Sequence, residues 1–176
     1  MALGATIVYV THDQSEALRL SARIVVMQRG AIVQSGPPAV VMNEPVNEFV
    51  ASCMGMETIV EGVAVRRVDG EVVMAVAGRE ISAIGAGDLG DHVYCCIRPE
   101  HVTIELTNQS GSSSARNVFA ASITSVTSAG AYLKVKLDCG FPLVATVTAE
   151  SLATLGLHRG RAVFASFKAT AVHVIR

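Results

Sequence analysis

The sequence predicts a mainly β protein, in which two small and similar barrel halves follow a short α/β segment. Most of its apolar runs are short, alternate with polar residues and end at glycine-containing turns, as half-buried strands do. One hydrophobic pattern also occurs twice along the chain. Only the first 55 residues combine a continuous apolar run with helical patterns. These observations together define the predicted fold class.

Residues 1–55 are typical of an α/β segment. The apolar, β-branched run at residues 5–10 predicts a strand buried on both faces of a parallel sheet. Thr11 or Asp13 should cap the helix that follows, and residues 24–33 should form a hairpin. Two short helices that each start at a proline should complete the segment, over residues 38–42 and 45–51.

The strand predicted at residues 5–10 lacks the neighbouring strands that a parallel sheet would supply. Such a strand must pair elsewhere, pack against another copy, or fray. We therefore expect either disorder near the start of the chain or a self-association contact there.

The rest of the chain reads as two β halves joined by a linker. Residues 56–106 form the first half, the polar stretch 107–113 is the linker, and residues 114–176 form the second half. The first half should contain strands at 59–66, 71–76, 80–83, 93–97 and 101–104, with turns at 69–70, 77–78 and 85–88. The second should contain strands at 123–126, 132–137, 143–147, 163–167 and 171–175, and a helix at 149–156.

The two halves share one hydrophobic register. Gly90 and Gly160 are 160 − 90 = 70 positions apart, and the same offset aligns the segment 93–104 with 163–174. This repeat predicts a pseudo-duplicated barrel. The halves differ where Arg98-Pro99-Glu100 aligns with Lys168-Ala169-Thr170. The second triplet offers a cation, backbone N–H groups and a hydroxyl, whereas the first contains a proline without an N–H and a carboxylate. If one half holds an anion, the second is the better candidate.

Composition excludes several function classes. The net charge of −1 argues against general nucleic-acid binding, which requires a basic surface. No apolar run approaches the length of a membrane-spanning helix, and the start has no basic region typical of a signal peptide. The four cysteines form no C-x-x-C pair and suit no metal site, so we interpret them as buried free thiols in a reducing cytoplasm.

The first 55 residues contain motifs in a characteristic order: Thr-His-Asp-Gln-Ser-Glu-Ala-Leu from Thr11, Val-Met-Gln-Arg-Gly-Ala-Ile-Val-Gln-Ser-Gly from Val26, and Glu-Pro-Val-Asn-Glu-Phe-Val-Ala from Glu44. This order resembles the last quarter of an ABC-transporter ATP-binding subunit. The resemblance implies that His12 matches the switch histidine beside the nucleotide's terminal phosphate. The alternative interpretation of His12 is a helix-capping or solvent-facing residue.

ATP hydrolysis by this chain is not expected. The sequence contains no G-x-x-x-x-G-K-[ST] loop and no Gly-Lys dipeptide at all, so nothing would cradle the phosphates of a nucleotide. The signature glycines and the strand-end Asp-Glu of the ABC family are absent too. We therefore expect neither ATP binding nor catalysis, and we expect His12 to be inactive here.

Three motifs in the second half carry a second resemblance. They are Ser114-Ala115-Arg116-Asn117, the step from Val147 to Ser151, and Phe167-Lys168-Ala169-Thr170. In this order they resemble the Mop-like half of a TOBE domain, an OB-like barrel that binds molybdate or tungstate. Arg98-Pro99-Glu100-His101 resembles the end of a first TOBE half. The resemblance implies an oxyanion site, formed between subunits, whose residues are Ser114, Ala115, Arg116, Asn117, Thr148, Ser151, Lys168, Ala169 and Thr170.

The chemistry of these residues suits a tetrahedral dianion. Molybdate and tungstate accept hydrogen bonds and donate none at neutral pH, so their site should present cations, hydroxyls and backbone N–H groups. The implied residues provide these donors and include no carboxylate. Each also has a simpler interpretation. Arg116 and Lys168 would be ordinary surface charges, and Thr148 and Ser151 would cap the short helix.

The two resemblances together imply a cytoplasmic regulatory and dimerisation module of a molybdate/tungstate importer. In the parent subunit, a homodimer would work with membrane permease subunits, and bound oxyanion would hold the ATPase pair at rest, so that a filled cell stops importing (trans-inhibition). No nucleic-acid partner and no insertion into the membrane are expected. The alternative is a TOBE module that only dimerises ATPase subunits, as in sugar importers, and binds no oxyanion.

Overall fold

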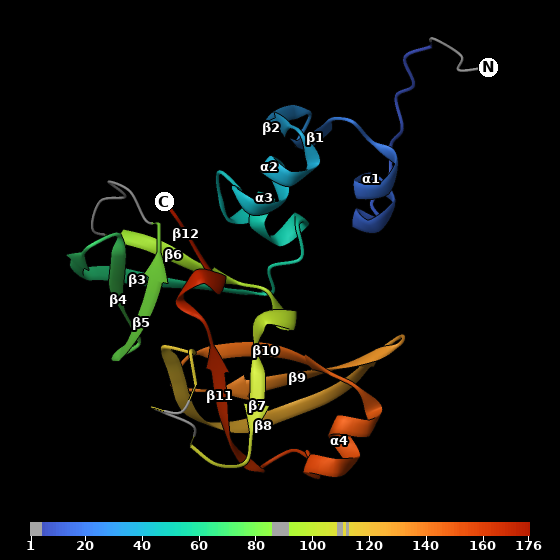
Figure 1. Cartoon of the computed structure of the whole chain (residues 1–176). Coiled ribbons are helices and arrows are strands. Elements are labelled where there is room, and N and C mark those ends of the chain that lie inside the picture. The colour runs from blue at the N-terminus through green and yellow to red at the C-terminus, as the bar shows by residue number, and fades with distance from the viewer. Residues whose placement is uncertain (1–4, 86–91, 109–110, 112) are drawn as a thin grey trace. The chain divides into compact units, whose positions relative to one another are not determined.

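The structure is a computed structural model that describes residues 5–85, 92–108, 111 and 113–176. The chain divides into two compact units, residues 1–55 and 56–176 (Figure 1). Some sequence-based expectations lie outside the described residues: disorder at residues 1–4, most of the turn at 85–88, the Gly90 end of the repeat, and residues 109, 110 and 112 of the linker.

The first unit contains a β-hairpin packed with short helices. Its elements are α1 (Gln14–Leu20), β1 (Ile24–Gln28), β2 (Ala31–Gly36), α2 (Pro38–Asn43) and α3 (Glu48–Cys53). The predicted hairpin and the helix starting at Pro38 are therefore present. A small core of buried side chains holds these elements together: Ile24, Val26, Val41, Val50 and Met54.

The prediction of a buried strand at residues 5–10 is wrong. The segment belongs to no strand, and the side chains of Ile7, Val8 and Val10 are 84%, 86% and 90% exposed. A strand is stable only when its backbone groups pair with a neighbour. Within the described part of this unit, the one sheet consists of β1 and β2, and it offers residues 5–10 no pairing.

Side-chain caps decide where two helices begin. Helix α3 was predicted to start at Pro45, but it begins at Glu48 because the Asn47 side chain accepts a hydrogen bond from the Val50 backbone N–H at 3.0 Å. Asp13, rather than Thr11, caps α1 by accepting from the Glu16 N–H at 3.1 Å. The Thr11 hydroxyl instead donates to the Glu16 carboxylate at 2.9 Å.

The second unit consists of two curled, five-stranded antiparallel sheets, which confirms the predicted mainly β, duplicated OB-like fold (Figure 1). One sheet has the order β12-β6-β3-β4-β5 and the other β10-β9-β8-β11-β7. The elements are β3 (Thr58–Val68), β4 (Glu71–Val76), β5 (Arg79–Ile84), β6 (His92–Ile97), the 3₁₀ turn η1 (Pro99–His101), β7 (Thr103–Glu105), β8 (Asn117–Ala129), β9 (Tyr132–Asp138), β10 (Pro142–Val147), α4 (Ala149–Leu155), β11 (Ala162–Phe167), the 3₁₀ turn η2 (Ala169–Ala171) and β12 (Val172–Ile175).

The two halves of this unit exchange their last strands. Strand β7, from the first half of the sequence, pairs with β11, whereas β12 pairs with β6. The registers match: Thr103 is opposite Ser166 and His173 is opposite Cys96, with 173 − 103 = 70 and 166 − 96 = 70. The repeat seen in the sequence is thus present in the structure. Residues 114–176 do not form a separate sheet, because β12 pairs with β6 of the first half and β11 pairs with β7.

Hydrogen bonds between the sheets join the halves further. At the start of β8, Asn117 accepts from the Ser82 backbone N–H at 2.8 Å and donates to the Ser82 carbonyl at 2.9 Å. At the equivalent start of β3, the Thr58 hydroxyl accepts from the Val144 N–H at 3.0 Å. Both side chains are 2% exposed. Each half is therefore fastened to the third strand of the other.

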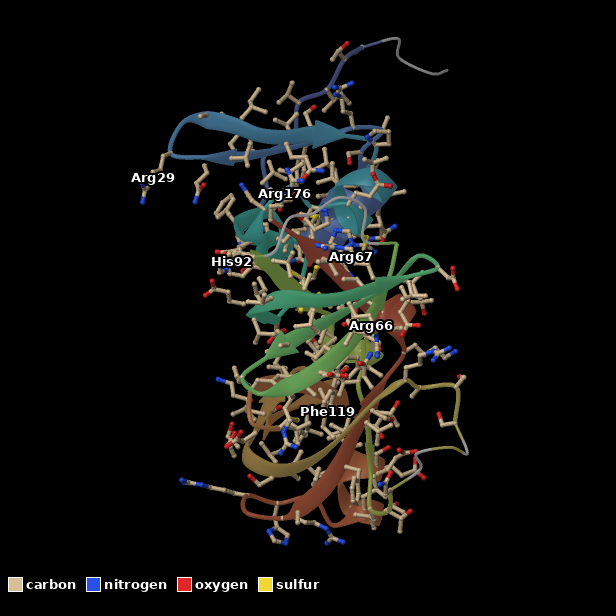
Figure 2. The ribbon with its side chains drawn as sticks, turned by 90° about the vertical axis from the view of Figure 1, so that its left-hand side faces the viewer. Arg29, Arg66, Arg67, His92, Phe119 and Arg176 are labelled. Carbon is tan, nitrogen blue, oxygen red and sulfur yellow. The ribbon has the colours of Figure 1, made fainter. Side chains whose placement is uncertain are left out.

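Aromatic packing fills the core beneath β11. Phe119 meets Phe141 edge-on at a centroid distance of 5.2 Å and lies 5.8 Å from Phe167. Figure 2 shows Phe119 inside the second unit, between its strands. Phe167 directly precedes Lys168, so this packing fixes the end of the strand that leads into the candidate site.

Two buried thiols in this core should make stability fall at alkaline pH. Burial raises the pKa of Cys95 to about 12 and, together with the Asp138 charge, that of Cys139 to about 12. An unfolded thiol titrates near pH 8.5. Burial keeps both thiols protonated in the folded state at pH values where they ionise in the unfolded state. Their contribution to the free energy of unfolding is therefore complete below pH ~8.5 and is lost as pH rises toward 12. We expect the free energy of unfolding in urea to fall above pH ~9. The double variant Cys95→Ala/Cys139→Ala should show a weaker pH slope, and an unchanged slope would contradict this assignment.

Candidate functional site

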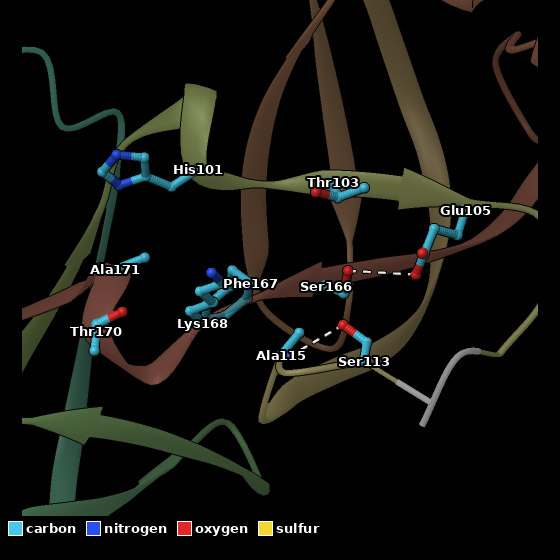
Figure 3. Close-up of a pocket in the computed structure, with 10 residues that line it drawn as sticks. All are labelled: His101, Thr103, Glu105, Ser113, Ala115, Ser166, Phe167, Lys168, Thr170 and Ala171. Atoms are coloured by element: carbon cyan, nitrogen blue, oxygen red, sulfur yellow. Dashed lines mark hydrogen bonds between the residues drawn. The ribbon is translucent and has the colours of Figure 1, made fainter. Parts of the chain in front are cut away.

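A pocket of about 580 Å³ opens where the exchanged strand β7 meets β11 and η2 (Figure 3). Its walls come from four parts of the second unit: η1 and β7, the segment before β8, the end of β11, and η2. The lining residues are His101, Thr103, Glu105, Ser113, Ala115, Ser166, Phe167, Lys168, Thr170 and Ala171. The pocket therefore gathers one lysine, several hydroxyls, one histidine and one carboxylate.

The Lys168–Thr170 corner is fixed by alternate burial. Phe167 and Ala169 are 2% and 5% exposed, whereas Lys168 and Thr170 are exposed. The Ala171 N–H donates to the Lys168 carbonyl at 3.0 Å and closes the 3₁₀ turn. Because the buried residues anchor the backbone, the ammonium group and the Thr170 hydroxyl are presented at the pocket (Figure 3).

The segment before β8 contributes Ser113 and Ala115. The Ala115 N–H donates to the Ser113 hydroxyl at 3.1 Å, which bends the chain toward the pocket. Ser114 and Arg116 are exposed and do not line it. Asn117 is buried, and its side-chain oxygen and one amide N–H bind the Ser82 backbone. Of this predicted motif, only Ala115 faces the pocket.

Thr148 and Ser151 form the N-cap of α4, as in the simpler interpretation of these residues. The Thr148 hydroxyl accepts from the Ser151 N–H at 3.0 Å and donates to the Ser151 hydroxyl at 3.0 Å. Neither residue lines the pocket, and neither does the buried Ala169. Among the residues predicted for an oxyanion site, the structure thus brings Ala115, Lys168 and Thr170 together.

Sequence reasoning missed the contribution of β7 and its flanks. His101, Thr103 and Glu105 belong to the first half of the sequence but line this pocket because of the strand exchange. The carboxylate was unexpected: Glu105 accepts a hydrogen bond from the Ser166 hydroxyl at 3.3 Å. The 70-residue repeat held a signal, because it aligns β7 with β12 and thus marks both as equivalent closing strands.

His12, the histidine matched to the ABC switch residue, is the other sequence-based candidate, and it does not line this pocket. His12, in the first unit, is exposed. In the part of the chain that the structure describes, no group of three or more His, Cys, Asp or Glu side chains could hold a metal ion. Among the described helices, none has the length and apolar character needed to cross a bilayer.

Comparison with known proteins indicates the class of domain that the second unit resembles. Residues 113–174 match the family model described as the TOBE domain. A solved structure of the cytoplasmic molybdate-binding protein ModG, with molybdate bound, has a similar fold. The match has a TM-score of 0.58 at 24% identity and covers 68% of this chain and 96% of that one.

More specifically, the chain is similar to ATP-binding subunits of importers. It is 39% identical to the molybdate/tungstate import ATP-binding protein WtpC of Pyrococcus horikoshii, over 97% of this chain and 47% of that protein. It is also 46% identical to the spermidine/putrescine import ATP-binding protein PotA of Acetivibrio thermocellus, over 58% of this chain and 28% of that protein. The resemblance to the ATP-binding subunit of a molybdate/tungstate importer, seen in the sequence, is confirmed. The chain spans about half the length of this relative.

Proposed function

We propose that the second unit binds molybdate or tungstate and serves as the oxyanion-binding domain of an importer's ATP-binding subunit. The observation that carries the proposal is the pocket itself: Lys168 and Thr170, from the part of the chain that matches the TOBE model, line it together with Thr103 and Ser113. A cation and several hydroxyl donors are what an acceptor-only dianion requires. Similarity to WtpC over 97% of the chain supports the choice of anion.

We further propose that a second copy of the chain completes the site. Ser114 and Arg116 are exposed but do not line the pocket, so their donors are available to a neighbouring molecule. An anion held between two copies stabilises the arrangement in which both contact it. In a full-length cytoplasmic subunit working with a membrane permease, this linkage would hold the ATPase pair at rest when oxyanion is plentiful. This chain itself should not hydrolyse ATP.

A second candidate function is a dimerisation module that binds no oxyanion. Two observations favour it: PotA, whose name specifies spermidine and putrescine, matches over 58% of the chain, and the pocket wall includes the Glu105 carboxylate. In this case the two copies would associate through their β surfaces alone, and Lys168 would be a solvated surface charge.

Isothermal titration with molybdate, tungstate, sulfate and phosphate separates the two candidates when sedimentation is measured alongside. We expect saturable binding of molybdate or tungstate and a dimer that these anions stabilise. Sulfate, which is also an acceptor-only dianion, tests whether the site selects by size. A stable dimer that binds none of the four anions would refute the oxyanion proposal and leave the dimerisation module.

A further inference from the structure

The polar pair Glu105–Ser166 forms one wall of the pocket and has no role in the function proposed so far. The Ser166 hydroxyl donates to Glu105 Oε2 at 3.3 Å, and Ser166 is only 4% exposed. Figure 3 shows the pair away from the Lys168–Thr170 corner, with the hydrogen bond along β7 and β11. The pocket therefore has a cationic corner and an anionic wall.

The internal repeat provides a control for what the fold alone requires. Strands β6 and β12 pair in the same register as β11 and β7. At the positions equivalent to Ser166 and Glu105, 70 residues away in each case, they carry Cys96 and Ile175. A thiol and an aliphatic side chain therefore serve the same strand pairing. Because the pairing needs neither a hydroxyl nor a carboxylate, the polar pair calls for an explanation from the pocket.

We propose that Glu105 determines which oxyanions the pocket accepts, by favouring those that carry a proton over fully deprotonated dianions. The inference rests on the proposal that this pocket binds oxyanions. A glutamate carboxylate is a hydrogen-bond acceptor and carries a negative charge at neutral pH. Its charge repels every anion, but an anion that has an O–H group, such as hydrogen phosphate, donates a hydrogen bond to it that offsets the repulsion, and molybdate has no such proton.

The partners of Glu105 strengthen this selectivity. The Ser166 proton is directed to Glu105, so that hydroxyl does not donate to an anion at the same time. The other charged or titratable groups in the wall are Lys168, which directly precedes η2, and His101 of η1. Lys168 attracts every anion, so its charge does not distinguish them. Glu105 is the wall group that accepts a hydrogen bond from a protonated anion and only repels an unprotonated one.

Glu105→Gln tests the proposal, because glutamine keeps the shape and an oxygen for Ser166 but removes the charge. Titrations at pH 8 with molybdate and with phosphate, which retains one proton there, give the two affinities. We expect molybdate binding to tighten, and the ratio of molybdate affinity to phosphate affinity to rise about 3–10-fold. Glu105→Ile, which copies Ile175, should also tighten molybdate binding. Glu150→Gln, an exposed change on α4, should alter neither affinity.

The outcomes separate this inference from the proposed function. If the wild type binds molybdate and both Glu105 variants bind it equally well, the selectivity role is wrong and the oxyanion function stands. If only the variants bind molybdate, the role of Glu105 is supported and the wild-type function is wrong. If no variant and no wild-type protein binds either anion, both are wrong.

Discussion

Replacing Lys168 with methionine is expected to weaken molybdate binding by about 10–150-fold. Methionine retains the aliphatic part of the side chain and removes the ammonium group. Lys168 is the lysine in the pocket lining. A hydrogen bond to a charged group contributes ~1.5–3 kcal/mol, and each ~1.4 kcal/mol corresponds to a factor of ten in affinity. Because Lys168 is exposed and its corner is anchored by Phe167 and Ala169, the free energy of unfolding should hardly change.

Two matched variants make the Lys168 result specific. Lys136→Met removes an exposed charge from β9, away from the pocket lining, and should leave the affinity unchanged. Arg116→Met should weaken binding only where a second copy completes the site, because Arg116 does not line the pocket of its own chain. Equal binding by the wild type and Lys168→Met in calorimetry would contradict the assignment of the cation.

Replacing Asn117 with alanine is expected to lower the free energy of unfolding by about 2–4 kcal/mol. The change removes two hydrogen bonds, of 2.8 and 2.9 Å, and leaves the Ser82 N–H and carbonyl without these partners. A buried backbone group left unpaired costs ~1–3 kcal/mol, and Ser82 is partly exposed, so water offsets part of the loss. Urea unfolding at pH 7 measures the difference.

The equivalent hydrogen bond between the sheets, made by Thr58 at the start of β3, serves as a comparison. Thr58→Val removes a single hydrogen bond, from the Val144 N–H, and should cost less than Asn117→Ala. Molybdate affinity of folded Asn117→Ala protein should stay close to that of the wild type, since the Asn117 side chain binds the Ser82 backbone. A large loss of affinity without a loss of stability would instead make Asn117 a direct ligand.

Local pattern predicted most strands of this fold but not their partners. Alternation and turn residues located the hairpins, including the Asp69-Gly70 and Ala77-Gly78 turns, where all four residues have positive φ. The 70-residue repeat predicted the duplication. Nothing in a local pattern says which distant strand lies alongside, so the exchange of β7 and β12 was not predicted. For the same reason, residues 5–10 looked like a buried strand although they have no pairing.

The candidate site was predictable where it is continuous in sequence. Lys168 and Thr170 directly follow the strand that the sequence predicts at residues 163–167. Glu105 and Thr103 reach the pocket only through the exchanged strand, so a list drawn from the second half contained donors and omitted the carboxylate. The helix cap at Thr148 shows the opposite case, in which a local hydrogen bond accounts for the residues.

A crystal structure of the chain with tungstate, located by the anomalous signal of tungsten, tests the central proposal most directly. The proposal predicts one tungsten peak in the pocket, with tungstate oxygens within hydrogen-bonding distance of Lys168 Nζ and Thr170 Oγ1. It also predicts that donors of a second copy approach the same anion. A tungsten peak only at the Thr148 cap, or an empty Lys168 pocket at saturating tungstate, would contradict it.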